Sequence, residues 1–221
     1  MSAIATGIEE IASDPKKKGF STKRIFEIPI PSPEGTKIFA VRFPTDEEWC
    51  WRARTLTNIT RNLGRDARRT EAPDELRIAK ELVVKILHGE SRDSDIEEYT
   101  ARKILETLGQ CELAQTQDRI GNVYVIEMVV PGATVTHRLK IPTQRQIGEY
   151  EKSNITATAR RNSTEIKLPL EPSGELWDQI QDGVSGYDDL SSVSILHKDV
   201  AVKQVIAQVN DVIQKGVNPE G

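Results

Sequence analysis

The sequence has little of the material from which disulfide-linked, zinc-binding and membrane proteins are built. Its two cysteines, Cys50 and Cys111, lie far apart and form no CxxC spacing. This pattern argues against a disulfide framework and against a zinc site, and a reducing compartment fits it best. No segment approaches the roughly 18 consecutive apolar residues that a membrane span requires, so we expect no membrane partner.

The first residues lack the apolar centre of a secretion signal, because Glu9, Glu10 and Asp14 interrupt a mildly apolar start. The Pro-Lys-Lys-Lys-Gly run that follows would break a helix. We expect residues 1 to 19 to form a flexible N-terminal arm. Docking of this arm on a neighbouring subunit is the second interpretation.

Catalytic motifs are also absent from the sequence. The histidines His88, His137 and His197 are widely spaced, and no HExxH, GxSxG, GxGxxG or Walker pattern occurs. We expect His137 to be a surface or rim imidazole on a strand rather than a catalytic base. We therefore predict a protein that is not an enzyme and that binds no cofactor.

Two acidic clusters resemble metal sites only in part. Residues 93 to 98 begin like a calcium loop, but they lack the glycine of its sharp turn and the distal glutamate. Carboxylates that decorate a helix N-terminus explain this cluster. Asp188 and Asp189 follow Gly186-Tyr187 and are interpreted as a turn and a helix cap. We expect no metal site at either cluster.

Core-forming residues are scarce too, with 37% hydrophobic and 5% aromatic residues against 29% charged ones. Such a composition is globular but lean, so a large shared interface or an external partner would help the chain to bury apolar surface. The net charge of -4 argues against a chain that coats nucleic acid over its whole length.

What the sequence does contain is a repeat at a spacing of 98 residues. Residues 25 to 45 read IFEIPIPSPEGTKIFAVRFPT, and residues 123 to 143 read VYVIEMVVPGATVTHRLKIPT. The identical positions are Ile28/Ile126, Pro33/Pro131, Thr36/Thr134, Pro44/Pro142 and Thr45/Thr143. Several other pairs keep their chemistry, for example Phe26/Tyr124. We therefore take half of the chain as the structural unit, a size of about 100 residues at which a core is feasible.

Each copy of the repeat predicts a β-hairpin. Alternating β-branched and aromatic residues favour strands over residues 23 to 30 and 37 to 43 in the first copy. The same pattern favours strands over residues 123 to 130 and 135 to 141 in the second copy. Proline and glycine between the strands of each pair are typical of a turn.

The Pro-Thr pair that follows each hairpin predicts the start of a helix. Thr45 with Glu48, and Thr143 with Gln146, have the spacing of a capping box, in which each side chain bonds to the other residue's backbone N–H. The proline stops the strand because it cannot donate to a ladder. The repeated motif therefore has a structural explanation.

Further amphipathic segments predict additional helices in both halves. The first helix places Trp49 in the core, and we expect it to extend to Leu63 and to end at Gly64. The predicted fold class is α+β, with two tandem similar modules, each a β-hairpin followed by a small helical bundle. The predicted segments are the arm at 1–19, module 1 at 20–112, module 2 at 117–215 and a tail at 216–221.

The strongest charge feature is basic, with six arginines and one acidic residue between positions 52 and 69. Three interpretations stay open: a solvated helix face and loop, a surface that binds an acidic protein through arginine forks, and nucleic acid, which the missing aromatic residues and the overall charge argue against. The candidate partner-binding residues are Arg52, Arg61, Arg65, Arg68, Arg69, Arg160 and Arg161.

The half-repeat resembles the tail assembly chaperones of tailed bacteriophages. The similarity rests on a strand, a short turn, a second strand that ends in Pro-Thr, and a small helical region. Its matching segments are residues 25 to 30, 38 to 45 and the helix from Asp46, and again residues 123 to 128, 135 to 143 and the helix from Gln144.

The resemblance implies a non-enzymatic role, in which the protein holds the tape-measure protein soluble and recruits tail-tube subunits in the host cytoplasm. Exposed hairpin edges would pair with partner strands, and helical grooves would hold apolar stripes. The alternative is a permanent virion component of the neck, tail or capsid surface, with a homo-oligomer compatible with either. A small nucleic-acid-binding protein is the third hypothesis.

Overall fold

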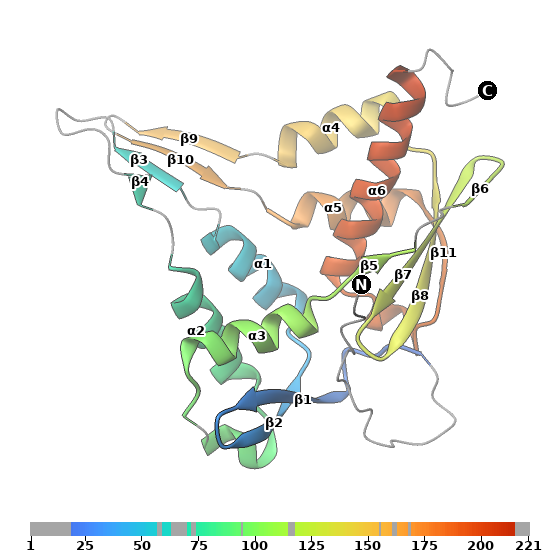
Figure 1. Cartoon of the computed structure of the whole chain (residues 1–221). Coiled ribbons are helices and arrows are strands. Elements are labelled where there is room, and N and C mark those ends of the chain that lie inside the picture. The colour runs from blue at the N-terminus through green and yellow to red at the C-terminus, as the bar shows by residue number, and fades with distance from the viewer. Residues whose placement is uncertain are drawn as a thin grey trace.

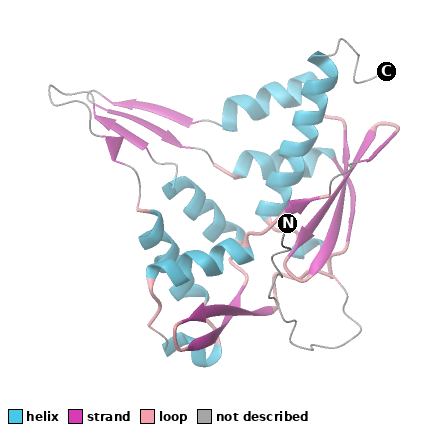
Figure 2. Cartoon of the chain, in the orientation of Figure 1, coloured by secondary structure: helices cyan, strands magenta, loops and turns pink. Residues whose placement is uncertain are grey.

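The computed structural model shows an α+β protein in which helices and strands form separate groups (Figures 1 and 2). This confirms the α+β part of the predicted fold class. The structure describes residues 19–56, 59–62, 70–71, 74–93, 95–114, 118–154, 156–160, 163–167 and 169–214. The predicted arm at 1–19, except for Gly19, and the predicted tail at 216–221 lie outside these residues.

The first half contains two hairpins and three α-helices in alternation. Its elements are β1 (Ile25–Ser32), β2 (Gly35–Arg42), α1 (Asp46–Leu56), β3 (Ile59–Asn62), β4 (Thr70–Glu71), α2 (Glu75–Ile86), the 3₁₀ helix η1 (Gly89–Asp93) and α3 (Glu98–Leu108). The second half begins with two short strands that pair with its hairpin. Its elements are β5 (Glu112–Leu113), β6 (Asp118–Ile120), β7 (Val123–Val130), β8 (Ala133–Lys140), α4 (Gln144–Asn154), β9 (Thr156–Arg160), β10 (Ser163–Lys167), α5 (Glu171–Ile180), β11 (Gln181–Ser185), η2 (Leu190–Ser192) and α6 (Ile195–Gln214).

The two halves share an order of hairpin, helix, hairpin and two further helices, to which the second half adds β5, β6 and β11. The bounds of β7, β8 and α4 lie 98 residues after those of β1, β2 and α1. In each half the first helix packs on the second, the second on the third, and the third on the first strand of the hairpin. Whether each half folds as a module by itself stays a prediction.

Both predicted capping boxes are present in the structure. The backbone N–H of Thr45 donates to Glu48 Oε2 at 2.8 Å, and the N–H of Glu48 donates to Thr45 Oγ1 at 3.3 Å. In the second half, the N–H of Thr143 donates to Gln146 Oε1 at 2.9 Å, and the N–H of Gln146 donates to Thr143 Oγ1 at 3.3 Å. These bonds satisfy donors that a helix start otherwise leaves open, so the repeated threonine is a structural residue.

The first helix is shorter than the sequence predicted. It ends at Leu56 rather than at Leu63, and the chain continues as strand β3. The residues around this point, Thr55, Thr57, Ile59 and Thr60, are β-branched, and such side chains lose rotamer freedom in a helix and fit a strand. The prediction of an uninterrupted helix was therefore wrong.

The strands form three sheets. β1 and β2 stand alone as a two-stranded sheet, and β11, β8, β7 and β5 form a larger sheet in this order, with β6 also paired to β7. The third sheet has the order β4-β3-β10-β9, so it joins one hairpin from each half. In Figure 1 it extends from the helical body beyond α1 and α4.

Residues from both halves contribute to one hydrophobic cluster, and Phe20 lies at its junction. The Phe20 side chain is 1% exposed, and its ring contacts those of Phe43 and His197 at centroid distances of 5.2 and 4.7 Å. Its N–H donates to the carbonyl of Gly186 at 2.6 Å, and its carbonyl accepts from the N–H of Asp188 at 2.9 Å. The start of the first half is thereby built into the second.

Asp46 makes another contact across the junction, and it yields a test. Its Oδ1 accepts from the backbone N–H of Ile195, the first residue of α6, at 2.8 Å. Asp46→Ala removes this acceptor from a helix N-terminus, and we expect a loss of about 1 kcal/mol in the free energy of unfolding. Glu47→Ala, one residue further along α1 and exposed, is the matched control. Urea unfolding measures both, and equal losses would contradict the capping role.

Candidate binding site

The free edge of β2 is identified by the hydrogen bonds of Ala40. The N–H of Ala40 donates to Ser91 Oγ at 3.0 Å, and its carbonyl accepts from the N–H of His88 at 2.8 Å. Ala40 thus faces away from β1. Because backbone direction alternates along a strand, the N–H and C=O of Thr36 and Ile38 also face away from β1. Among the described residues, no strand and no hydrogen bond covers them.

The opposite edge of the hairpin is blocked by proline. Pro29 pairs with Ile38 and Pro31 with Thr36, so both prolines lie at positions whose backbone groups face away from β2. Proline has no N–H, and an edge strand that carries it offers a partner strand fewer donors. Binding of an added strand is therefore directed to β2.

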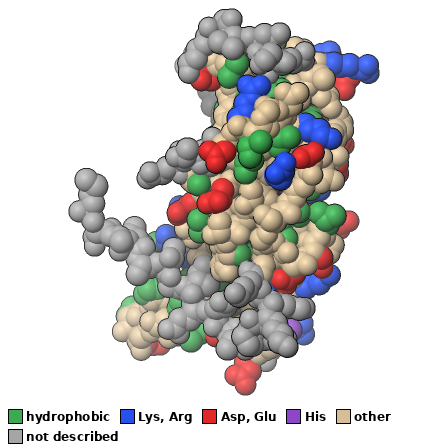
Figure 3. All heavy atoms as spheres, turned by 90° about the vertical axis from the view of Figure 1, so that its right-hand side faces the viewer, with side chains coloured by type: hydrophobic (Ala, Val, Ile, Leu, Met, Phe, Trp, Pro, Cys, Tyr) green, Lys and Arg blue, Asp and Glu red, His purple; other side chains and the backbone are tan. Residues whose placement is uncertain are grey.

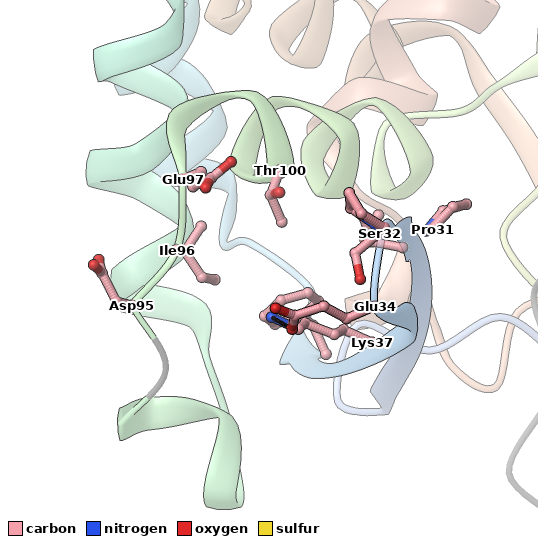
Figure 4. Close-up of a pocket in the computed structure, with 11 residues that line it drawn as sticks. Pro31, Ser32, Glu34, Lys37, Asp95, Ile96, Glu97 and Thr100 are labelled. Carbon is pink, nitrogen blue, oxygen red and sulfur yellow. Dashed lines mark ion pairs between the residues drawn. The ribbon is translucent and has the colours of Figure 1, made fainter.

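A pocket of about 340 Å³ lies under the tip of this hairpin (Figure 4). Its apolar lining comes from Ile30 and Phe39 on the hairpin and from Ile96 before α3. In the close-up, Ile96 and Thr100 point into the space between α3 and the hairpin. Lys37 is on its rim, 3.6 Å from Glu34. We call this the hairpin pocket.

The second hairpin is covered on both sides, which corrects the expectation of two equally exposed hairpins. β11 pairs with β8, and both β5 and β6 pair with β7. A hollow of about 400 Å³ remains at its turn, lined among others by Val129 and Pro131. Figure 3 shows the side of the molecule on which this sheet lies, with hydrophobic side chains scattered among acidic and basic ones.

Arg52 is the only predicted partner-binding arginine whose side chain the structure describes. It lies on α1 with its guanidinium 5.9 Å from the ring centroid of Trp49 and 3.8 Å from Glu75. Its side chain is 22% exposed, and burial lowers its pKa from 12.5. These contacts give Arg52 a structural role at this surface, and a role in partner binding stays a prediction.

Two further predicted arginines lie on strands of the four-stranded sheet. Arg61 on β3 lies opposite Thr164 of β10, and Arg160 on β9 lies opposite Ser163 of the same strand. Arg65, Arg68, Arg69 and Arg161 lie outside the described residues. By sequence, residues 59 to 71 and 156 to 167 together carry a net charge of +4, in a chain of net charge -4.

The structure contradicts the prediction for His137. His137 is fully buried rather than at a surface or rim, because its partners come from segments far away in sequence. Trp177 Nε1–H donates to His137 Nδ1 at 2.8 Å, which leaves the proton of His137 on Nε2, 2.7 Å from the hydroxyl of Tyr187. That hydroxyl lies 3.1 Å from His197 Nδ1. His88 is exposed.

The histidine network holds two uncharged imidazoles in the core. Burial lowers the pKa of His137 and of His197 from 6.5 to about 3, and burial also raises the pKa of Tyr187. His197 Nε2 is buried and has no hydrogen-bond partner among the described residues. A group whose protonation is so strongly opposed does not suit acid–base chemistry near neutral pH.

The two acidic clusters have structural partners. Asp188 lies 3.3 Å from Arg24 and Asp189 lies 3.2 Å from Lys23, so both tie the second half to the first. Asp189 is at the N-cap position of η2 and accepts from two serine hydroxyls, but its side chain makes no capping hydrogen bond to a backbone N–H. Asp95 lies 3.7 Å from Lys80. Within the described residues, no group of three or more potential ligands is placed to hold a metal ion.

The described helices include none with the length and apolar character needed to cross a membrane. Comparisons with known proteins identify no relative, since no family model, no curated protein and no solved structure matches the chain. The sequence predicted exposed hairpin edges but not which strand edge is free, and it did not predict the hairpin pocket. The available signal was the IPIPSP run, in which prolines at every second position indicate an edge strand.

The buried histidines predict how stability depends on pH. The unfolded chain binds protons at these side chains below about pH 6.5, whereas the folded chain resists protonation down to about pH 3. The free energy of unfolding therefore falls as the pH decreases through this window, by up to about 1.4 kcal/mol per pH unit for each histidine.

Chemical unfolding between pH 7 and 4 measures this slope. His137→Gln keeps a neutral hydrogen-bonding side chain. We expect it to reduce the slope of the free energy of unfolding against pH by the contribution of about one bound proton. His88→Gln, at an exposed position, is the control and should leave the slope unchanged. Parallel curves for the wild type and His137→Gln would contradict the assignment.

Proposed function

We propose that the protein is a non-enzymatic assembly protein of a tailed bacteriophage, which binds the tape-measure and tail-tube proteins in the host cytoplasm as a chaperone. The observation that carries this proposal is the unit of hairpin, Pro-Thr capping box and helix, which the chain contains twice and by which it resembles tail assembly chaperones. The free β2 edge and the hairpin pocket are surfaces on which such binding takes place.

A binding role is also supported by the buried histidines and the paired aspartates, which make structural contacts. The buried histidines bond to Tyr187 within the second half, where His197 also contacts Phe20, and Asp188 and Asp189 pair with Arg24 and Lys23 of the first half. Among the described residues, the β2 edge and the hairpin pocket, with its apolar and charged lining, remain open, and the strands of the four-stranded sheet lie in segments that are basic by sequence. These features recognise backbone, apolar side chains and acidic groups rather than a reacting bond.

Co-expression with the tape-measure and tail-tube proteins of the same phage tests the proposal. We expect affinity purification of the chain to recover at least one of them, and we expect mass spectrometry of finished particles to show that the chain is absent. Recovery of neither protein would contradict the chaperone function. The chain at full occupancy in finished particles would favour the alternative, a permanent virion component.

The predicted basic surface is tested by charge removal. Changing Arg65, Arg68 and Arg69 together to Ser should weaken binding of an acidic tail protein about tenfold at low salt, since exposed ion pairs contribute roughly 0.2 to 1 kcal/mol each. Changing Arg102, Lys103 and Arg145 to Ser is the matched control, because it removes the same charge from α3 and α4.

Affinity is measured for both triple variants by titration at two salt concentrations. Equal weakening by the two triple variants would show that only net charge matters. Retention of DNA at low salt that the first triple variant abolishes would support the nucleic-acid hypothesis instead.

A further inference from the structure

The two halves differ in what the chain does after the second helix. In the second half, α5 is followed by β11, which pairs with β8 through Gln181 and then Gly183 to Ser185. In the first half, α2 is followed by a single bridge, Leu87 to Val41, which is the counterpart of Gln181 to Leu139. Both halves therefore begin a third strand at the same place.

Gly89 ends this third strand in the first half. Gly89 and Gly183 both occupy the third position after the preceding helix, but Gly89 has a φ of 56° and begins η1, whereas the chain at Gly183 passes an irregularity in register and continues as a strand. The left-handed conformation at Gly89 takes the chain out of the extended conformation of a strand and into η1. The third strand of the first half is thus reduced to its first residues.

The part of β2 that stays open is the part that β11 covers in the other half. Ile38 corresponds to Thr136, which pairs with Ser185 of β11. Thr36 corresponds to Thr134, whose carbonyl lies so near Gly186 that a Cβ there would clash. The second half therefore shows, within the same chain, how a strand is accommodated at this position.

We propose that an extended segment of a partner protein binds antiparallel to β2 at Thr36–Ile38 and completes the three-stranded arrangement that the second half builds with β11. The inference rests on the proposed function and names its binding site. It also gives a role to Ile38, whose side chain is 60% exposed. Ile38 lies on β2, and the prolines Pro29 and Pro31 lie on the paired strand β1.

The partner segment has a defined chemistry. Residues paired across an antiparallel ladder lie on the same face, so the residue opposite Lys37 or Phe39 projects on the side of the hairpin pocket. In β11 the residue opposite His137, the counterpart of Phe39, is Val184, which packs against the core. An apolar, β-branched residue at this place in the partner therefore fits the hairpin pocket.

A second copy of the chain does not fit the edge equally well. If β2 paired with β2 of a second copy in an antiparallel arrangement centred on Lys37, the two Lys37 residues would lie directly opposite each other. Like charges at such positions are destabilising, and a lysine on an edge strand opposes self-pairing. The occupant is therefore a different protein with an extended apolar segment.

Ile38→Pro is the variant that tests the site. It removes the N–H that faces the partner and leaves the ladder to β1 intact, because Ile38 and Pro29 do not exchange hydrogen bonds. Thr136→Pro, the matched change in the second half, removes an N–H that faces β11 and should lower stability instead. Ile38→Lys, which keeps the N–H and adds a charge to the edge, is a second variant should Ile38→Pro fail to fold.

Two probes are used on the full chain: the tape-measure and tail-tube proteins, and binders selected from a displayed library of random short peptides. We expect selected peptides to carry alternating β-branched residues and to lose at least about tenfold in affinity on both Ile38 variants. Hydrogen exchange at Thr36 and Ile38 should be fast in the free chain and slowed in the complex.

The outcomes separate this inference from the proposed function. Tail proteins that bind wild type and both Ile38 variants equally would overturn the site and leave the proposed function standing. Peptides that depend on Ile38, with no binding of tail proteins, would support the site and contradict the function. Failure to select any Ile38-dependent peptide, or a dimer of the free chain that Ile38→Lys dissociates, would overturn the site.

Discussion

The packing of the uncharged His197 imidazole against Phe20 is the contact on which the shared core of the two halves depends. Tyr187, from the segment after β11, also contacts Phe20 and links His197 of α6 to His137 of β8, which accepts from Trp177 of α5. The hydrogen bonds of this network each join side chains from different elements. The relative positions of the elements are therefore fixed together, and the hairpin that they support is held in place.

The two halves share a scaffold of hairpin and helices and differ at the edges of their hairpins. The same hairpin, capping box and helix packing occur in both halves, but one hairpin is enclosed by neighbouring strands and the other is open on one side. The difference traces to backbone conformation at Gly89 and to prolines at alternate positions of β1. One hairpin is thus built into a larger sheet, whereas the other keeps a free strand edge.

The parts of the fold that could be predicted from the sequence are those that depend on neighbouring residues. Both hairpins and both capping boxes follow from turn residues and from Thr-x-x-Glu and Thr-x-x-Gln spacing. The four-stranded sheet could not be predicted, because β3 gains a partner in β10 only when the halves meet. The burial of His137 could not be predicted for the same reason. The sequence around β8 does not indicate that Trp177 and Tyr187 pack against this side chain.

The four-stranded sheet also sets an order of events during synthesis. Asn62 pairs with Ser163, about 100 residues later in the chain. The first half has therefore emerged from the ribosome before β10 is synthesised. Until then, the edge of β3 that pairs with β10 has no partner from its own chain. Pairings of such long range form slowly and are exposed to aggregation while they wait.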